Sequence, residues 1–95
     1  MKNISGIVFK TLREIKQPHM TYEALAEGLD LSSSCVFQLE HGNTKPSNKT
    51  ILKYCFFYNI PELDFLHLLM IVKNLQLPED EVKNRTKELY SKYNS

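Results

Sequence analysis

The amino-acid sequence predicts an all-α fold. Apolar residues recur at helical spacing in six segments, and Pro, Gly, Asn and Asp residues typical of helix ends separate these segments. No segment alternates apolar and polar residues over the length of a strand. The chain has 95 residues and a hydrophobic fraction of 42%, which suffices for one small domain with a packed core.

Two helices are expected before residue 30. The first covers residues 5–16, and Pro18, which disfavours helix at the residue before it, either closes this helix or begins the following loop. Its apolar stripe consists of Ile4, Ile7, Val8, Leu12 and Ile15. Thr21 is a good N-cap for a second helix, which ends near Leu29. Asp30 occupies the turn that follows, because aspartate tolerates the left-handed conformation better than most residues.

A third helix is expected over residues 33–41, directly after this turn. Ser32 can N-cap it, and Gly42 can adopt the left-handed conformation that ends it. Val36 and Leu39 share one side of this helix and point inward. Two short helices around a tight turn form a supersecondary motif that is common in DNA-binding proteins.

The second half of the chain predicts three more helices. Ser47 can cap a fourth helix over residues 48–58, whose inner side is expected to carry Ile51, Leu52, Cys55 and Tyr58. A fifth helix, about 62–74, is apolar almost all round, so it is either central or shared with a partner. Pro78 begins a sixth helix, with acidic residues in its first turn and basic residues later, as the helix dipole favours.

Net charge, cysteine content and the length of the apolar runs limit the classes of protein to which the chain can belong. The net charge is +1, and residues 1–60 hold seven Lys or Arg against five Asp or Glu, so any contact with nucleic acid depends on local placement. Two cysteines do not make a disulfide framework, and no leader peptide is visible, which together favour the cytoplasm. The longest mostly apolar run, residues 65–72, is too short to cross a membrane, and no membrane association is expected.

Catalytic and metal-binding motifs are not visible in the sequence. The three histidines, His19, His41 and His67, show no ligand spacing with Cys35 or Cys55, so no metal site is expected. There is no nucleophile–base–acid set, no Gly-rich phosphate loop and no paired-carboxylate motif. Neither an enzyme nor a cofactor-binding protein is therefore expected.

Several fragments between Leu12 and Leu66 together resemble the Cro/repressor-type helix-turn-helix family, the lambda-repressor-like or XRE domain of phage and bacterial regulators. The fragments are LREIK at residues 12–16, Leu25-Ala26-Glu27, Leu31-Ser32, Gln38-Leu39-Glu40-His41-Gly42, Lys45-Pro46-Ser47 and Ile51-Leu52-Lys53. Asp30 stands where the family usually has glycine, and helix 33–41 carries no Arg or Lys. By the same resemblance, Glu40 pairs with Lys16 or Arg13 to orient two helices.

The resemblance implies a five-helix lambda-repressor-like domain over residues 1–74 and an added helical extension over 75–95. It further implies a transcriptional regulator that reads a palindromic operator in double-stranded DNA through helix 33–41, acting as a homodimer. The fifth and sixth helices are the candidates for the dimer interface. The chain shows no sensor domain, so regulation is expected to depend on its concentration, its dimerisation or a regulatory protein partner.

Particular residues follow from placing helix 33–41 in the major groove. Ser33, Ser34 and Gln38 would reach base edges, and Gln38 can bond adenine bidentately. Phe37 either touches a thymine methyl or packs against the end of another helix, and His41 faces outward or sideways. The groups near phosphates would be Thr21, Tyr22, Asn43, Thr44 and Lys45, with Ser32 capping the reading helix.

A protein-interaction module, such as an antirepressor or adaptor, is the alternative function. An exposed Phe37, the absence of basic residues from helix 33–41 and the near-neutral charge favour it. Lys45, the Ser and Gln side chains and the completeness of the family pattern favour DNA binding.

Overall fold

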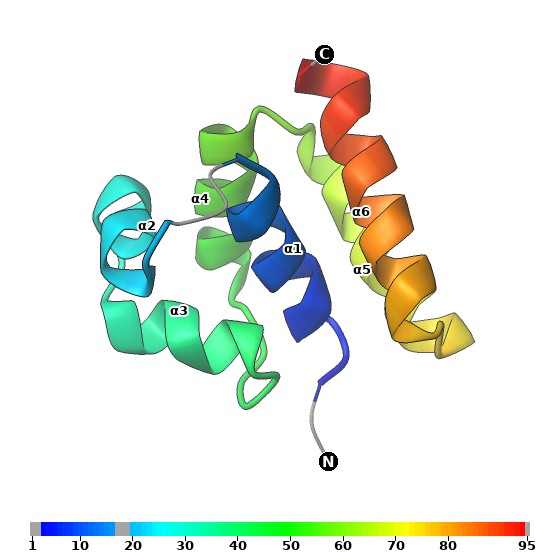
Figure 1. The fold of residues 1–95 in the computed structure, drawn as a ribbon, viewed down its shortest axis with the longest axis horizontal. Coiled ribbons are helices and arrows are strands. Elements are labelled where there is room, and N and C mark those ends of the chain that lie inside the picture. The colour runs from blue at the N-terminus through cyan, green and yellow to red at the C-terminus, as the bar shows by residue number, and fades with distance from the viewer. Residues whose placement is uncertain (1–2, 17–19, 95) are drawn as a thin grey trace.

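The chain forms six helices in a computed structural model that describes residues 3–16 and 20–94 (Figure 1). They are α1 (Gly6–Lys16), α2 (Tyr22–Leu29), α3 (Ser33–Glu40), α4 (Asn48–Tyr58), α5 (Glu62–Leu75) and α6 (Glu79–Asn94). No strand occurs among the described residues, so the all-α prediction is confirmed. Pro18, expected to close the first helix or begin the following loop, lies outside the described residues.

The helix boundaries follow local capping chemistry. The hydroxyls of Thr21, Ser32 and Ser47 accept hydrogen bonds from backbone N–H groups three residues later, at 3.1, 3.1 and 3.2 Å. Each bond satisfies a donor that the first turn of a helix leaves free. Asp30 and Asn59 end α2 and α4 in the left-handed conformation, with φ of 58° and 56°. The expected role of Asp30 in the turn is therefore confirmed.

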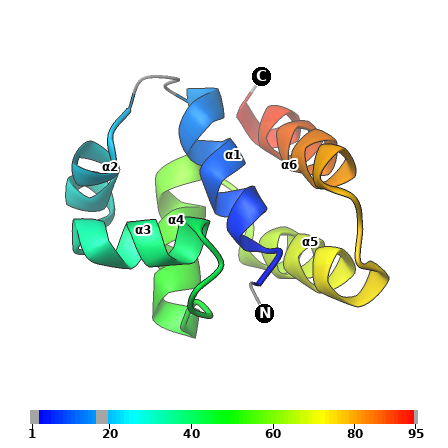
Figure 2. The ribbon, with the colours of Figure 1, turned by 60° about the horizontal axis from the view of Figure 1, so that its bottom comes forward.

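One core joins the helices, and α6 contributes to it. Phe9 of α1 lies at the centre, edge-on to the rings of Tyr54 in α4 and Phe65 in α5. Val82 of α6 is fully buried in the same cluster, and Thr86 one turn later is also buried. The last helix lies along both α1 and α5 (Figures 1 and 2). It therefore covers the first helix of the chain as well as its own neighbour.

Side-chain hydrogen bonds fix the C-terminal end of α6 to the corner between α4 and α5. Asn94 Nδ2 donates to the carbonyl oxygen of Tyr58 at 2.8 Å, and Asn59 Nδ2 donates to that of Tyr93 at 3.1 Å. The Tyr93 hydroxyl donates to the carboxylate of Asp64 in α5. The start of α6 is thus held by apolar packing at Val82, and its end by the hydrogen bonds of Tyr93 and Asn94.

The expected inner face of α4 is partly wrong. Ile51, Cys55 and Tyr58 are buried as expected, but Leu52 is 50% exposed. Tyr54 is buried in the core where Leu52 was expected, because α4 is rotated so that the ring of Tyr54 packs against Phe9. The next outward residue, Phe56, is 92% exposed.

The fifth helix buries only one of its apolar sides. Phe65, Leu68 and Val72 enter the core, and α6 covers the adjacent side of the helix. Leu63 and Met70 are exposed on the outer side, together with Leu66. The helix is therefore peripheral, and its outer apolar stripe is uncovered in the single chain.

No single helix among residues 3–16 and 20–94 combines the length and apolar character needed to cross a membrane. Only α4 and α5 taken together reach that length and composition, and they are bent by 116° relative to each other.

Candidate nucleic-acid interface

All eleven side chains proposed from the sequence lie in one continuous region: the start of α2, the whole of α3 and the turn that follows it. Ser34, Phe37, Asn43, Thr44 and Lys45 are exposed, while Ser33, Gln38 and His41 are partly exposed. Val36 and Leu39 are buried, as predicted. We call the solvent-facing side formed by Ser33, Ser34, Phe37, Gln38 and His41 the α3 face.

Arg13 and Glu40 fix the position of α3 against α1. Arg13 Nε and Nη2 donate to the two carboxylate oxygens of Glu40 at 2.8 and 3.0 Å, and Nη1 donates to the carbonyl oxygen of Met20 at 2.7 Å. The Glu40 side chain is completely buried. Hydrogen bonding to Glu40 raises the pKa of Arg13. Arg13 is one of the two partners expected for Glu40, and the side chain of the other, Lys16, lies outside the described part of the structure. The guanidinium of Arg13 ties α1, the approach to α2 and the end of α3 together.

Aromatic rings join α2 to α3 at the edge of the α3 face. Phe37 stacks on His41 with ring centroids 3.9 Å apart, and it meets Tyr22 edge-on at 5.4 Å. The Arg13 guanidinium lies over the Tyr22 ring, 4.7 Å from its centroid. Because Tyr22 is the first residue of α2, this packing agrees with the expectation that Phe37 contacts the end of another helix. The ring is still 40% exposed, so one part of it faces solvent.

His41 is held in place by the same group. Its Nδ1 lies 2.9 Å from the carbonyl oxygen of Phe37, and its own backbone N–H also donates to that oxygen. An N–H on Nδ1 is the donor in this contact, which leaves Nε2 available to a ligand. His41 therefore faces sideways along α3 rather than inward.

The turn after α3 depends on two glycines. Gly42 has a φ of +69°, and a Cβ there would overlap the carbonyl oxygen of Asn3. The backbone N–H of Asn3 donates to the carbonyl oxygen of Gly42 at 2.8 Å. A Cβ at Gly6 would lie 2.6 Å from the carbonyl oxygen of Glu40, so α1 approaches the end of α3 at backbone distance. The N-terminal segment thus supports the turn that carries Asn43, Thr44 and Lys45.

Gln38 and Asn43 form a pair on the α3 face. Asn43 Nδ2 donates to Gln38 Oε1 at 2.8 Å, and the backbone N–H of Asn43 donates to the carbonyl oxygen of Gln38 at 3.0 Å. Ser34, Thr44 and Lys45 have no side-chain hydrogen bond or ion pair with any other residue in the described ranges. Their polar groups are consequently free to contact a ligand.

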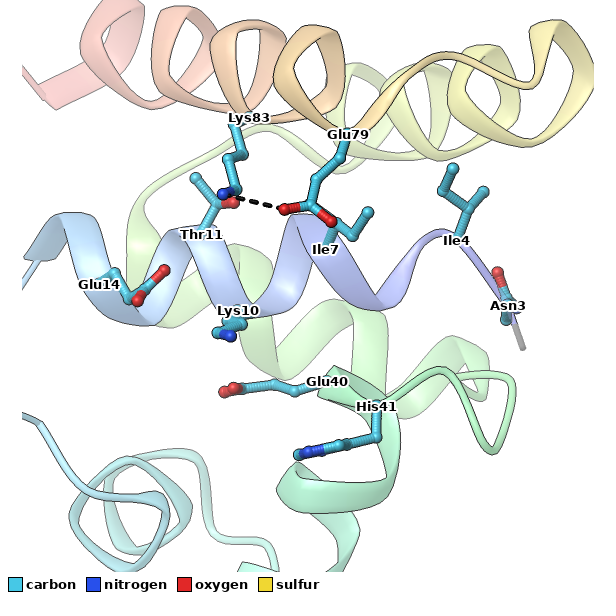
Figure 3. A pocket seen from close by; sticks show the side chains of 10 residues that line it. All are labelled: Asn3, Ile4, Ile7, Lys10, Thr11, Glu14, Glu40, His41, Glu79 and Lys83. Carbon is cyan, nitrogen blue, oxygen red and sulfur yellow. Dashed lines mark ion pairs between the residues drawn. The ribbon is translucent and has the colours of Figure 1, made fainter.

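A groove lies beside α1 and shares His41 with the α3 face. This groove of about 350 Å³ runs between α1, the end of α3 and the start of α6 (Figure 3). Its charged residues carry both signs, and on the α6 side Lys83 and Glu79 pair at 3.0 Å. It is lined by Asn3, Ile4, Ile7, Lys10, Thr11, Glu14, Glu40, His41, Glu79 and Lys83. Opposite charges neutralise one another in the groove and offer no net attraction for an anion. The α3 face carries no charge of its own, but the exposed Lys45 follows it in the turn, so this face is the better candidate for binding nucleic acid.

No protein-family model, curated protein or solved structure matches this chain. Among the residues that the structure describes, no group of three or more His, Cys, Asp or Glu side chains could hold a metal ion.

Two contributions to this region were not visible from sequence. The hydrogen bond between Gln38 and Asn43 spans the helix end, and only the conformation of Gly42 brings the two amides together. The support from Asn3 joins residues that are 39 positions apart, for which no local pattern exists. The sequence pointed to the turn itself, through the left-handed conformation expected at Gly42 and the cap expected at Ser47, but not to these two contacts.

Proposed function

We propose that the protein binds double-stranded DNA sequence-specifically through the α3 face, as a transcriptional regulator of the phage or mobile-element type. The observation that carries the proposal is the placement of α3. Arg13 and Glu40 fix a short helix whose outer side presents serine, glutamine and histidine, with free backbone amides of α2 on one flank and Lys45 on the other. A helix held in this way is suited to enter the major groove as the second helix of a helix-turn-helix.

The groups divide into base-reading and phosphate-binding sets. Ser33, Ser34 and Gln38 lie along α3, where their donors and acceptors can meet base edges. The start of α2 and the residues Thr44 and Lys45 lie on the flanks, where contacts fix register without reading sequence. α3 itself carries no positive charge, so affinity depends on these flanks.

Selection of bound sequences from random duplex DNA is the decisive experiment. A defined consensus is expected, and Gln38→Ala should weaken binding to it by about 1–3 kcal/mol while barely changing binding to a scrambled duplex. Lys45→Ala should weaken both duplexes and lower the slope of log K against log salt by about one unit. Lys87→Ala, which removes an exposed lysine from α6, is the matched control and should alter neither. No binding to any duplex at low salt would refute the proposal.

We further propose that a homodimer binds the operator, with the outer side of α5 at its interface. Leu63 is 78% exposed there, and Leu66 and Met70 continue the stripe. A two-fold dimer would let two copies of α3 contact two half-sites. Light scattering of the intact chain and of Leu63→Glu with Met70→Lys tests this. Deletion of residues 78–95 is unsuitable, because Val82 and Thr86 belong to the core of the single chain.

A protein-interaction module is the second candidate, and the exposed part of Phe37 favours it. A protein partner would bury that ring as an anchor, and Phe37→Ala would then cost about 2 kcal/mol or more at nearly constant affinity across salt concentrations. DNA binding would instead fall steeply with salt, because condensed counterions are released. Affinity measured at two salt concentrations for wild type and Phe37→Ala separates the two functions.

A further inference from the structure

We infer that the outer side of α4 is a surface through which two copies of this chain associate. Lys49, Leu52 and Phe56 share this side of the helix at spacings of three and four residues, and Glu62 follows at the start of α5. We call these four residues the α4 patch. The patch shares no residue with the α3 face or with the α5 stripe described above, so the inference does not depend on DNA binding.

Phe56 is the centre of the patch. Its side chain is 92% exposed, more than that of any other large apolar residue in the described ranges. Leu52, one turn earlier, is 50% exposed. Neither residue enters the core, which takes Tyr54 and Cys55 from the same helix. Adjacent apolar side chains that the fold leaves in water are typical of a surface that a partner covers.

Leu52 and Phe56 form a ridge between two grooves. The larger groove, of about 760 Å³, lies on the side of the ridge toward the start of α5, and Cys55 and Ile60 contribute to its wall. The smaller one, of about 370 Å³, lies toward the end of α2 and includes Leu29. A projecting ring and an apolar groove on the same surface are self-complementary, because each copy can insert its ring into the groove of the other. An interface between identical subunits related by a two-fold axis has this property.

The two ends of the patch carry opposite charges. Lys49 is exposed in the first turn of α4 and lines the smaller groove, whereas Glu62 is exposed at the start of α5 and lines the larger one. Neither makes an ion pair within residues 3–16 and 20–94. A two-fold axis close to Phe56 and perpendicular to α4 would run the two copies of this helix antiparallel. Lys49 of each copy would then face Glu62 of the other, so the charges favour a second copy of the chain over a partner of uniform charge.

The first test measures association of the full-length chain without DNA, by sedimentation velocity across a series of concentrations. Two self-associating surfaces allow assembly beyond the dimer, so wild type should form tetramers and Phe56→Glu should stop at dimers. The Leu63→Glu, Met70→Lys variant, which disables the α5 stripe, should still dimerise through the α4 patch. Adding Phe56→Glu to that variant should raise its dissociation constant by about tenfold or more, because a central aromatic anchor is replaced by a charge. The thermal midpoint should not change, since Phe56 makes no contribution to the core.

A charge exchange tests the antiparallel arrangement in the same Leu63→Glu, Met70→Lys variant. Lys49→Glu alone and Glu62→Lys alone each place like charges opposite one another, so each should weaken dimerisation several-fold. The two changes together restore opposite charges and should recover most of the lost affinity. Lys87→Glu, at an exposed position of α6 outside the patch, is the matched control and should leave dimerisation unchanged.

The outcomes distinguish this inference from the dimer proposed at α5. If Phe56→Glu associates as strongly as wild type while the Leu63→Glu, Met70→Lys variant is monomeric, the α4 patch is not a self-association surface and α5 alone pairs the subunits. If Phe56→Glu alone makes the chain monomeric, the α4 patch is the dimer interface and the α5 proposal fails. A wild type that remains monomeric at high concentration would overturn both. No recovery in the variant with exchanged charges would overturn the pairing of Lys49 with Glu62.

Discussion

Arg13 holds the α3 face in position through contacts with three residues from different parts of the chain. It donates to both oxygens of a buried carboxylate, donates to the carbonyl oxygen of Met20 and lies over the ring of Tyr22. A buried pair of this kind contributes mainly by fixing geometry, because the attraction is offset by the cost of removing both charges from water. Its loss, in contrast, leaves one buried charge without its partner.

Glu40→Ala should therefore be strongly destabilising. Removal of the carboxylate leaves the Arg13 guanidinium, whose side chain is only 13% exposed, without its counter-charge. We expect a loss of about 3 kcal/mol in the free energy of unfolding, measured by urea denaturation. Glu79→Ala is the matched control, since it breaks the exposed pair with Lys83 on α6 and should have a far smaller effect. Similar losses for both variants would contradict the structural role of Glu40.

Stability should also fall in alkaline solution. Burial raises the pKa of Cys55 to about 11 from an ordinary value of 9.0, and it raises those of Tyr54 and Tyr58 above their ordinary 10.0. The unfolded chain releases these protons at the ordinary values while the folded chain retains them, so unfolding becomes easier. The contribution of Cys55 is fully present below pH 9.0 and is lost as the pH rises to about 11. Thermal melts between pH 8 and pH 11 should show a falling midpoint.

Tyr54→Phe isolates one of these groups. The Tyr54 hydroxyl is buried and has no hydrogen-bond partner among the described residues. Removing it takes away a buried polar group and one titrating proton, while the contact with Phe9 remains. The variant should be at least as stable as wild type at pH 7 and should lose less stability above pH 9. A clear loss at pH 7 would show that the hydroxyl makes a stabilising contact.

At the scale of elements, the turn between α3 and α4 is the most constrained connection. Gly42→Ala would place a methyl group against the carbonyl oxygen of Asn3 and force a residue with a Cβ into a φ of +69°. We expect a loss of about 2 kcal/mol or more in unfolding free energy, measured by thermal or urea denaturation. Gly28→Ala is the control for the strained φ, because the φ of Gly28 is not positive; its added methyl group would lie 2.7 Å from the Phe57 ring and requires only that this side chain shift, so its loss should be smaller.

The positions of the helices could be predicted from sequence because their ends are determined locally. Thr21, Ser32 and Ser47 each cap the helix that follows, and Asp30 ends α2 with a conformation open to few residues. The side of α4 that enters the core could not be predicted in the same way. Leu52 and Tyr54 are close in sequence, and only the packing of Tyr54 on Phe9 decides which of them is buried.

The location of the candidate site was also predictable, but its internal contacts were not. All the proposed residues lie together because two short helices and one turn bring them there. The pair of Gln38 with Asn43 and the stack of Phe37 on His41 depend on side-chain conformations that no spacing rule fixes. The sequence offered two basic residues of α1 to Glu40, and only the folded arrangement of α1 and α3 shows that Arg13 pairs with it.

For the whole molecule, α6 is part of the fold and not a detachable appendage. Val82 is fully buried in the core that contains Phe9 and Phe65. Val82→Ala should lower the free energy of unfolding by about 2 kcal/mol through lost burial and a residual cavity. Leu75→Ala is the control, because that leucine is 63% exposed at the end of α5 and should change stability by less than about 0.5 kcal/mol. Equal effects would mean that α6 is only loosely attached.

The contact of α6 with α1 also governs the order in which the chain acquires its structure. Val8 of α1 and Val82 of α6 are buried in the same core, so α1, which is synthesised before the other five described helices, completes its packing only after α6. Until synthesis reaches α6, the apolar side of α1 that α6 will shield stays accessible to chaperones and to other nascent chains. Bringing α6 to α1 closes the long chain segment between them, which costs conformational entropy before the contacts between the two helices form. The docking of α6 on α1 should therefore limit the rate of folding.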